Sequence, residues 1–138
     1  MSRSAFVDSS GWYALIDRRD PSHTRAADLS RTLIRDGWRL LTTDYVIDES
    51  CTLARVRAGS RAAGRLLDLL DQTVALDVEW IGPERFDQAK LLFRKQLDQG
   101  FSFTDCTSFV VMKEKEIADA LTSDAHFSAR GFRLLLRD

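Results

Sequence analysis

The stretch Ala5–Asp17, "AFVDSSGWYALID", contains the start of the fold in one short run of residues. Apolar residues followed by an acid, Ala5 to Asp8, are typical of a short buried strand that ends at a carboxylate. Ser9 or Ser10 is then expected to cap a short helix, because a hydroxyl oxygen accepts a hydrogen bond from the free amides of a first helical turn. A strand that runs directly into a helix is the unit from which parallel sheets are built.

The same alternation of short apolar runs and longer helical patterns continues along the chain. Four more strands are expected, in residues 38–43, 73–81, 118–122 and 131–136. Helices are expected between them, in residues 20–37, 45–58, 60–72 and 82–100, and residues 101–116 are expected to form a loop that enters a mostly buried helix. Residues 73–81, "TVALDVEWI", alternate enough to indicate an edge strand. The pattern predicts a three-layer α/β/α sandwich with a central, mostly parallel five-stranded sheet.

Composition limits the classes of protein that are compatible with this chain. Its 138 residues, with 44% hydrophobic and 30% charged residues, suit a single globular domain over residues 1–138. No apolar run approaches the roughly 20 residues that cross a bilayer, and no signal peptide is recognised. We therefore expect a cytoplasmic protein with no membrane partner. Cys51 and Cys106 are too few and too far apart for a metal knuckle, and we expect reduced, buried thiols.

Charge excludes one mode of nucleic-acid binding and leaves another open. A formal net charge of -1 argues against a protein that coats nucleic acid through its overall field. A local basic patch is still compatible with the sequence, because arginines cluster at positions 18, 19 and 25 and at positions 55, 57, 61 and 65. Arginine suits bidentate contacts with phosphate, although solvated helix faces explain such clusters equally well.

One acid lies where a surface helix would not place it. In "YVIDESCTLARV", Tyr45 to Val56, the helical period puts Tyr45, Val46, Leu53 and Val56 on one apolar stripe with Glu49 in its middle. Asp48 projects to the flank and is expected to be solvated. No lysine or arginine occupies a neighbouring position on that stripe, and an unpaired carboxylate among apolar side chains is costly. Glu49 is therefore a candidate functional residue.

Three further acids are candidate functional residues. Asp8 and Asp124 follow predicted strands, and ligands of parallel sheets bind beyond the carboxyl ends of the strands. Asp105 lies where a loop enters an apolar helix. Each of the three also suits helix capping or a turn. Carboxylates that converge repel one another unless a cation lies between them, and an all-oxygen set favours Mg²⁺ or Mn²⁺. Such an ion can activate water against a phosphodiester.

Four segments together resemble a known family. "FVDSSGWYAL", "YVIDESCTLARVRAG", "SFTDCTSF" and "ALTSDAHFSARGF", in this order, are similar to the motifs of the PIN domain, most closely the VapC-like toxin ribonucleases. The resemblance implies a parallel sheet with flanking helices, Mg²⁺- or Mn²⁺-dependent cleavage of RNA, frequent homodimers, and in operon-encoded members a separate antitoxin. It assigns the family's catalytic and metal-binding acids to Asp8, Glu49, Asp105 and Asp124.

Several other residues receive predictions of lesser weight. Thr104, Thr122 and Ser123 are expected to orient ligands or water around the acids. Asp44 is expected to be the N-cap of its helix. His126 is expected to have a structural role in the turn "DAHF", and His23 to pack or cap, so histidine is not part of the predicted mechanism. Trp12, Trp38 and Trp80 are expected in the core.

The sequence is compatible with three functional interpretations. The first is a nuclease of single-stranded RNA, either a toxin or a processing enzyme. The second is a PIN-fold interaction module with little turnover, which the full set of acids disfavours. The third is a phosphatase or receiver domain with Asp8 as nucleophile. That reading is weaker because the phosphatase pattern needs a second Asp at the position of Ser10.

Overall fold

The strands of the protein form one parallel sheet. The computed structural model describes residues 3–137. The strands are β1 (Ser4–Val7), β2 (Arg39–Thr43), β3 (Leu76–Glu79), β4 (Asp119–Leu121) and β5 (Arg133–Leu134). Their spatial order is β3-β2-β1-β4-β5, and every neighbouring pair is parallel. The predicted five-stranded sheet is confirmed, with β3 at an edge as expected.

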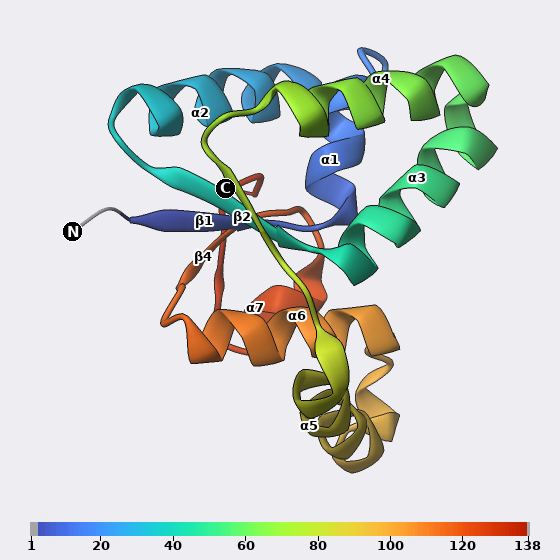
Figure 1. The fold of residues 1–138 in the computed structure, drawn as a ribbon, viewed down its shortest axis with the longest axis vertical. Coiled ribbons are helices and arrows are strands. Elements are labelled where there is room, and N and C mark those ends of the chain that lie inside the picture. Colours follow the sequence, from blue (N-terminus) through green and yellow to red (C-terminus); the bar gives the residue numbers. More distant parts are fainter. Residues whose placement is uncertain (1–2, 138) are drawn as a thin grey trace.

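Helices cover both faces of the sheet (Figure 1). Helices α1 (Ser9–Ile16), α2 (His23–Arg35), α3 (Asp44–Ala58) and α4 (Ser60–Gln72) pack together on one side. On the other side are α5 (Gly82–Lys95), the 3₁₀ turn η1 (Leu97–Gln99), α6 (Phe103–Glu114) and α7 (Ala125–Ala129). The predicted three-layer α/β/α sandwich is confirmed. No helix within residues 3–137 is long and apolar enough to span a bilayer.

The central strand β1 fixes the position of the first helix. Ala5, Phe6 and Val7 are fully buried between β2 and β4. Gly11, in the first turn of α1, lies so close to the backbone carbonyl of Leu121 that a Cβ atom there would overlap it. Only glycine allows this approach, which brings the start of α1 against the end of β4.

The helix caps differ from the prediction in two places. Asp8, rather than Ser9 or Ser10, caps α1, with its side chain accepting from the Gly11 amide. Thr43, rather than Asp44, caps α3, while the carboxylate of Asp44 accepts from the Ile81 amide. Gly59, with its φ of 93°, separates α3 from α4. Sequence identified the residue types of the caps but not their register.

Some residues predicted to be buried are exposed. Val56, assigned to the apolar stripe of α3, is 79% exposed, because the stripe ends one turn earlier at Leu53. Trp12 lies in the core and Trp38 packs against it, but Trp80 is 72% exposed because it follows the edge strand β3.

Candidate active site

Acidic side chains collect where β1 and β4 end. Asp8 directly follows β1, and Asp124 lies three residues beyond Leu121, the last residue of β4. These two strands are parallel neighbours, with Val7 opposite Leu121, so both acids lie at the carboxyl edge of the sheet. This is the edge at which ligands of parallel sheets bind.

Asp8 is buried and is held only by uncharged donors. Its side chain accepts hydrogen bonds from the Gly11 amide at 3.1 Å and from the Ser10 and Thr122 hydroxyls at 2.9 and 2.8 Å. Asp8 is 5% exposed. Burial raises the pKa of its carboxyl to about 7, and the nearby negative charge of Asp124 adds to the rise, while the three hydrogen bonds oppose it. No lysine or arginine within residues 3–137 forms an ion pair with it.

Glu49 turns toward the same place from α3. Its Oε1 accepts a hydrogen bond of 2.6 Å from the hydroxyl of Ser9, in the first turn of α1. The side chain is half-buried, while the adjacent Asp48 is exposed, as predicted. The unusual position of Glu49 on the helix is therefore explained, because its carboxylate is directed at the residue that follows Asp8.

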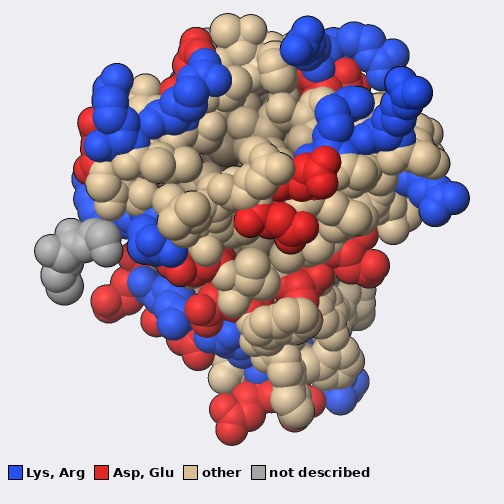
Figure 2. Space-filling view, turned by 45° about the horizontal axis from the view of Figure 1, so that its top comes forward, with Lys and Arg blue, Asp and Glu red and all other residues tan. Residues whose placement is uncertain are grey.

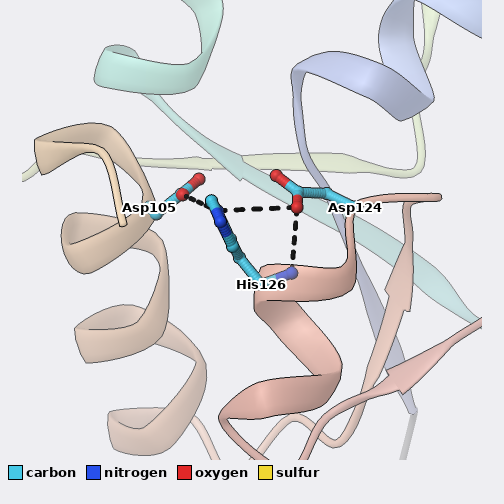
Figure 3. Close-up of side chains that lie close together, drawn as sticks. All are labelled: Asp105, Asp124 and His126. Atoms are coloured by element: carbon cyan, nitrogen blue, oxygen red, sulfur yellow. Dashed lines mark hydrogen bonds and ion pairs between the residues drawn. The ribbon is translucent and has the colours of Figure 1, made fainter. Parts of the chain in front are cut away.

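A histidine lies between two further acids (Figure 3). Nδ1 of His126, in α7, is 2.9 Å from Oδ2 of Asp105, in α6, and 3.6 Å from Oδ1 of Asp124. One donor atom from each of the three residues lies within 4.8 Å of the other two. The ring of His126 meets the buried Phe101 edge-on, with centroids 5.3 Å apart, which limits its rotation.

The hydroxyl of Thr122 connects Asp8 to Asp124. It donates a hydrogen bond to the Asp8 carboxylate and accepts one of 3.0 Å from the backbone amide of Asp124. The hydroxyl of Ser10 lies 3.0 Å from it and accepts the amide of Ser123 at 3.2 Å. Thr122 thus lies beside the acids as predicted, whereas Ser123 joins the network through its backbone. Thr104 contributes a carbonyl that accepts from the hydroxyls of Thr107 and Ser108.

Three of the acids also cap helices. Asp8 caps α1, Asp124 caps α7, and Asp105 forms a capping box with Ser102 at the start of α6. The helix-capping roles that the sequence allowed for these three acids are therefore confirmed, and they do not prevent the same carboxylates from lying close together. Helix N-termini offer amide donors and a partial positive charge, so they stabilise carboxylates that have no cation beside them.

The carboxylates of this group fit a hard divalent ion. Asp105, Asp124 and His126 each offer one donor atom within 4.8 Å of the other two. The carboxylate oxygens of Asp105 and Asp124 suit Mg²⁺ or Mn²⁺, whereas the imidazole of His126 is bonded to Asp105. Within residues 3–137, Asp8 and Glu49 are not in that group of donors. Asp8 is linked to that group through Thr122, whereas Glu49 is bonded to Ser9, the residue that follows Asp8.

The ring of His126 is the feature that sequence reasoning missed. We expected His126 to serve the turn, and its backbone amide does bond to Asp124 Oδ1 at 2.9 Å. The side chain, however, lies between the two acids. Its spacing of two residues from Asp124 was the available signal, but nothing in the sequence alone brings Asp105 to its other side.

Comparison with known proteins identifies the family of the chain. The family model described as "PIN domain" matches residues 5–133. The chain belongs to the PIN-domain family. A 23S rRNA-specific endonuclease, VapC20 of Mycobacterium tuberculosis, is 35% identical over 129 residues, which are 92% of this chain and 94% of the relative.

Other relatives extend the PIN-domain assignment. A VapC ribonuclease of Archaeoglobus fulgidus is 24% identical over 127 residues, which cover 91% of this chain and 80% of the relative. A crystal structure of M. tuberculosis VapC20, described as a sarcin-ricin loop cleaving toxin, superposes with a TM-score of 0.84 at 32% identity. The match covers 94% of this chain and 96% of that one. This PIN domain is therefore similar to VapC endonucleases and ribonucleases along nearly its whole length.

Proposed function

We propose that this PIN domain is a divalent-metal-dependent endoribonuclease and the toxin of a type II toxin-antitoxin pair, acting in the cytoplasm. The observation that carries the proposal is the hydrogen-bonded network that joins Asp8, Asp124 and Asp105 through Thr122 and His126 at the carboxyl edge of the sheet, with Glu49 bonded to Ser9, the residue after Asp8. None of these acids forms an ion pair with lysine or arginine within residues 3–137. Nearly full-length similarity to ribonucleases supports the same reaction.

In this proposal the four acids hold Mg²⁺ or Mn²⁺. The ion, when bound, offsets the carboxylate charge and favours ionisation of a water that attacks the phosphodiester. Asp105 and Asp124 have carboxylate oxygens within 4.8 Å of one another. Thr122 keeps Asp8 beside Asp124, Ser9 holds Glu49 next to the end of β1, and both acids add negative charge to the site.

Hydroxyl and amide donors keep the carboxylates in place. Asp8 has donors on both oxygens, so its plane is fixed before any ion arrives. Thr122 couples the position of Asp8 to that of Asp124, and a change in one therefore displaces the other. Preorganisation of this kind spares the protein the reorganisation that would otherwise accompany the reaction.

Cleavage of RNA tests the proposal directly. We expect the purified protein to cut 23S rRNA, the substrate in the relative's name, with Mg²⁺ or Mn²⁺ and not with chelator. Asp8→Asn and Glu49→Gln should each lower the rate by more than about 100-fold, beyond the usual effect of an outer-shell residue. Asp48→Asn is the matched control, since Asp48 is the exposed acid next to Glu49. Cleavage that survives chelator and both substitutions would refute the mechanism.

The toxin role and the assembly have their own tests. Expression should arrest growth, and co-expression of a separate antitoxin chain from the same operon should restore it. Growth arrest that is lost in Glu49→Gln but kept in Asp48→Asn would support the toxin assignment. Active cleavage without arrest would instead favour a processing nuclease. A homodimer is proposed from the resemblance, and the mass in solution measures it.

A further inference from the structure

A hollow of about 340 Å³ opens beside Glu49. Ser9, Glu49 and Ser123 line one part of it, and Tyr13 and Arg57 line another. Sites that hold small organic molecules begin at about 300 Å³, so this space suits a nucleotide unit rather than an ion alone. Figure 2 shows acidic side chains at the centre of one face, with basic side chains toward the upper right, where α3 and α4 lie in Figure 1.

Arg57 differs from the arginines that form ion pairs with acidic residues. Arg19 pairs with Asp17, and Arg85 pairs with Glu79 and Glu114. Arg57 forms no ion pair with an acid within residues 3–137, and its guanidinium carbon lies 5.5 Å from the centre of the Tyr13 ring. Its charge is thus available to a ligand while its position is limited by the ring beneath it.

The ring under Arg57 is itself fixed. Tyr13 is 8% exposed, and its hydroxyl donates a hydrogen bond of 2.5 Å to Asp17. Asp17 is also bound by the backbone amide and the guanidinium of Arg19. A guanidinium stacked on an immobile ring loses less conformational entropy when it binds a planar or tetrahedral anion.

The position of Arg57 along α3 indicates which part of a substrate it contacts. Arg57 lies eight residues after Glu49, which corresponds to a rise of about 12 Å along the helix axis. A strand whose scissile phosphate lies at the acids and which continues through the hollow would bring a neighbouring phosphate to Arg57. The hydroxyls of Ser9 and Ser10 line the same passage.

We propose that Arg57, stacked on Tyr13, binds a phosphate of the RNA strand next to the phosphate that is cut. The inference rests on the proposed ribonuclease function and adds a substrate contact to it. Arginine suits this contact because its planar fork donates two parallel hydrogen bonds to phosphate oxygens. The contact contributes to binding and register rather than to the bond-breaking step.

A salt titration of RNA binding tests the contact. The protein carries Glu49→Gln to prevent turnover, and a fluorescent RNA of the sarcin-ricin loop is the probe. Arg57→Gln should weaken binding about 10-fold, the value of a charge-assisted hydrogen bond. It should also reduce the slope of log affinity against log salt by about 0.7 to 0.9, as expected for one lost phosphate contact.

Arg55→Gln is the matched control. Arg55 lies on the same helix, is exposed, and points about 160° away from Arg57 around the axis. It should leave both the affinity and the salt slope nearly unchanged. Arg57→Lys should restore the slope but not the full affinity, since it keeps the charge without the fork.

Kinetics and stability separate substrate binding from a structural role. In the otherwise unchanged protein, Arg57→Gln should raise KM about 10-fold with kcat within about threefold. Equal salt slopes and equal KM values for Arg57→Gln and Arg55→Gln would overturn the inference, as would a lowered melting temperature without any change in slope. If the unsubstituted protein does not cleave RNA, the proposed function fails, while the binding comparison still decides the role of Arg57.

Discussion

Acidic residues at the amino end of the sheet are paired with arginine, whereas the acids beyond the ends of β1 and β4 are not. At the amino ends of the strands, Asp119 is 4% exposed and lies 2.6 Å from Nε of Arg133, with Arg3 at 3.8 Å. Nearby, Asp77 receives hydrogen bonds of 2.8 and 2.9 Å from Arg39. The Arg39 guanidinium holds the pKa of the Asp77 carboxyl below its usual range.

At the carboxyl end of β3, Glu79 is also paired with Arg85, but beyond β1 and β4 the carboxylates of Asp8, Asp105 and Asp124 meet hydroxyls, amides and one imidazole instead. The pKa of Asp8 is raised to about 7, chiefly because it is buried without a cation. An acid paired with arginine has its charge balanced within the chain and has no need of a ligand. An acid without such a partner remains electrostatically unsatisfied. This difference supports the proposal that an ion binds beyond the ends of β1 and β4.

Neutralising Asp8 should give the largest change in stability. A folded pKa above the unfolded value means that folding favours the protonated form, so Asp8 costs stability as the pH rises from about 4 to about 7. In chelator at pH 8, Asp8→Asn should raise the free energy of unfolding by on the order of 2 to 4 kcal/mol. The amide can still accept from Gly11 and can donate to Thr122.

Chemical denaturation of both proteins at several pH values measures this effect. The difference between Asp8→Asn and the unsubstituted protein should shrink toward zero as the pH falls to about 4. At the amino end, Asp77→Asn should show no gain at pH 8, because its carboxylate is already paired. A difference for Asp8→Asn that is the same at pH 5 and pH 8 would show that an unpaired charge is not the cause.

Removing one hydroxyl should give the next largest effect. Thr122→Val keeps the shape of the side chain but deletes the donor to Asp8 and the acceptor of the Asp124 amide. We expect cleavage to slow by about 10- to 100-fold, as for other outer-shell partners of metal ligands. Thr122→Ser retains the hydroxyl and should retain most of the activity. Steady-state cleavage of labelled RNA compares the two, and equal losses would mean that packing rather than the hydroxyl matters.

Breaking an ion pair at the amino end should give the smallest effect. Arg133→Gln removes the closest partner of buried Asp119 but leaves Arg3 nearby. Because the Arg133 side chain is 67% exposed, the loss should be about 1 kcal/mol in the free energy of unfolding. RNA cleavage should be unchanged. Reduced cleavage with unaltered stability would contradict the division between a structural end and a functional end.

The fold was predictable because the hydrophobic pattern carries most of its information. Short apolar runs separated by amphipathic helices specify parallel strands, and each strand was expected within a few residues of its place. Cap register was not predictable, since Asp8 and Ser9 are equally good caps and tertiary contacts choose between them. The exposure of Trp80 depends on how β3 ends at the edge of the sheet, which no local pattern encodes.

The individual acids of the candidate site could be predicted from the sequence, but the contacts between them could not. Asp8 and Asp124 follow strands, and Glu49 interrupts an apolar stripe, so each could be selected from local sequence alone. The link through Thr122 and the bridge formed by His126 depend on contacts between residues more than 20 positions apart in the chain. Such contacts arise only when the strand order is known, and the sequence did not determine that order.

Binding of Mn²⁺ to the metal-free protein tests the central claim most directly. Calorimetric titration should detect binding of Mn²⁺, and the bound ion should raise the melting temperature. The free energy of unfolding should rise by about 2.7 kcal/mol when the Mn²⁺ concentration is 100 times the dissociation constant. Asp124→Asn should weaken the affinity about 10-fold or more, and Asp77→Asn should leave it unchanged. Absence of binding at millimolar Mn²⁺, or equal affinity in Asp124→Asn and Asp77→Asn, would contradict the assignment of the carboxyl edge as the ion site.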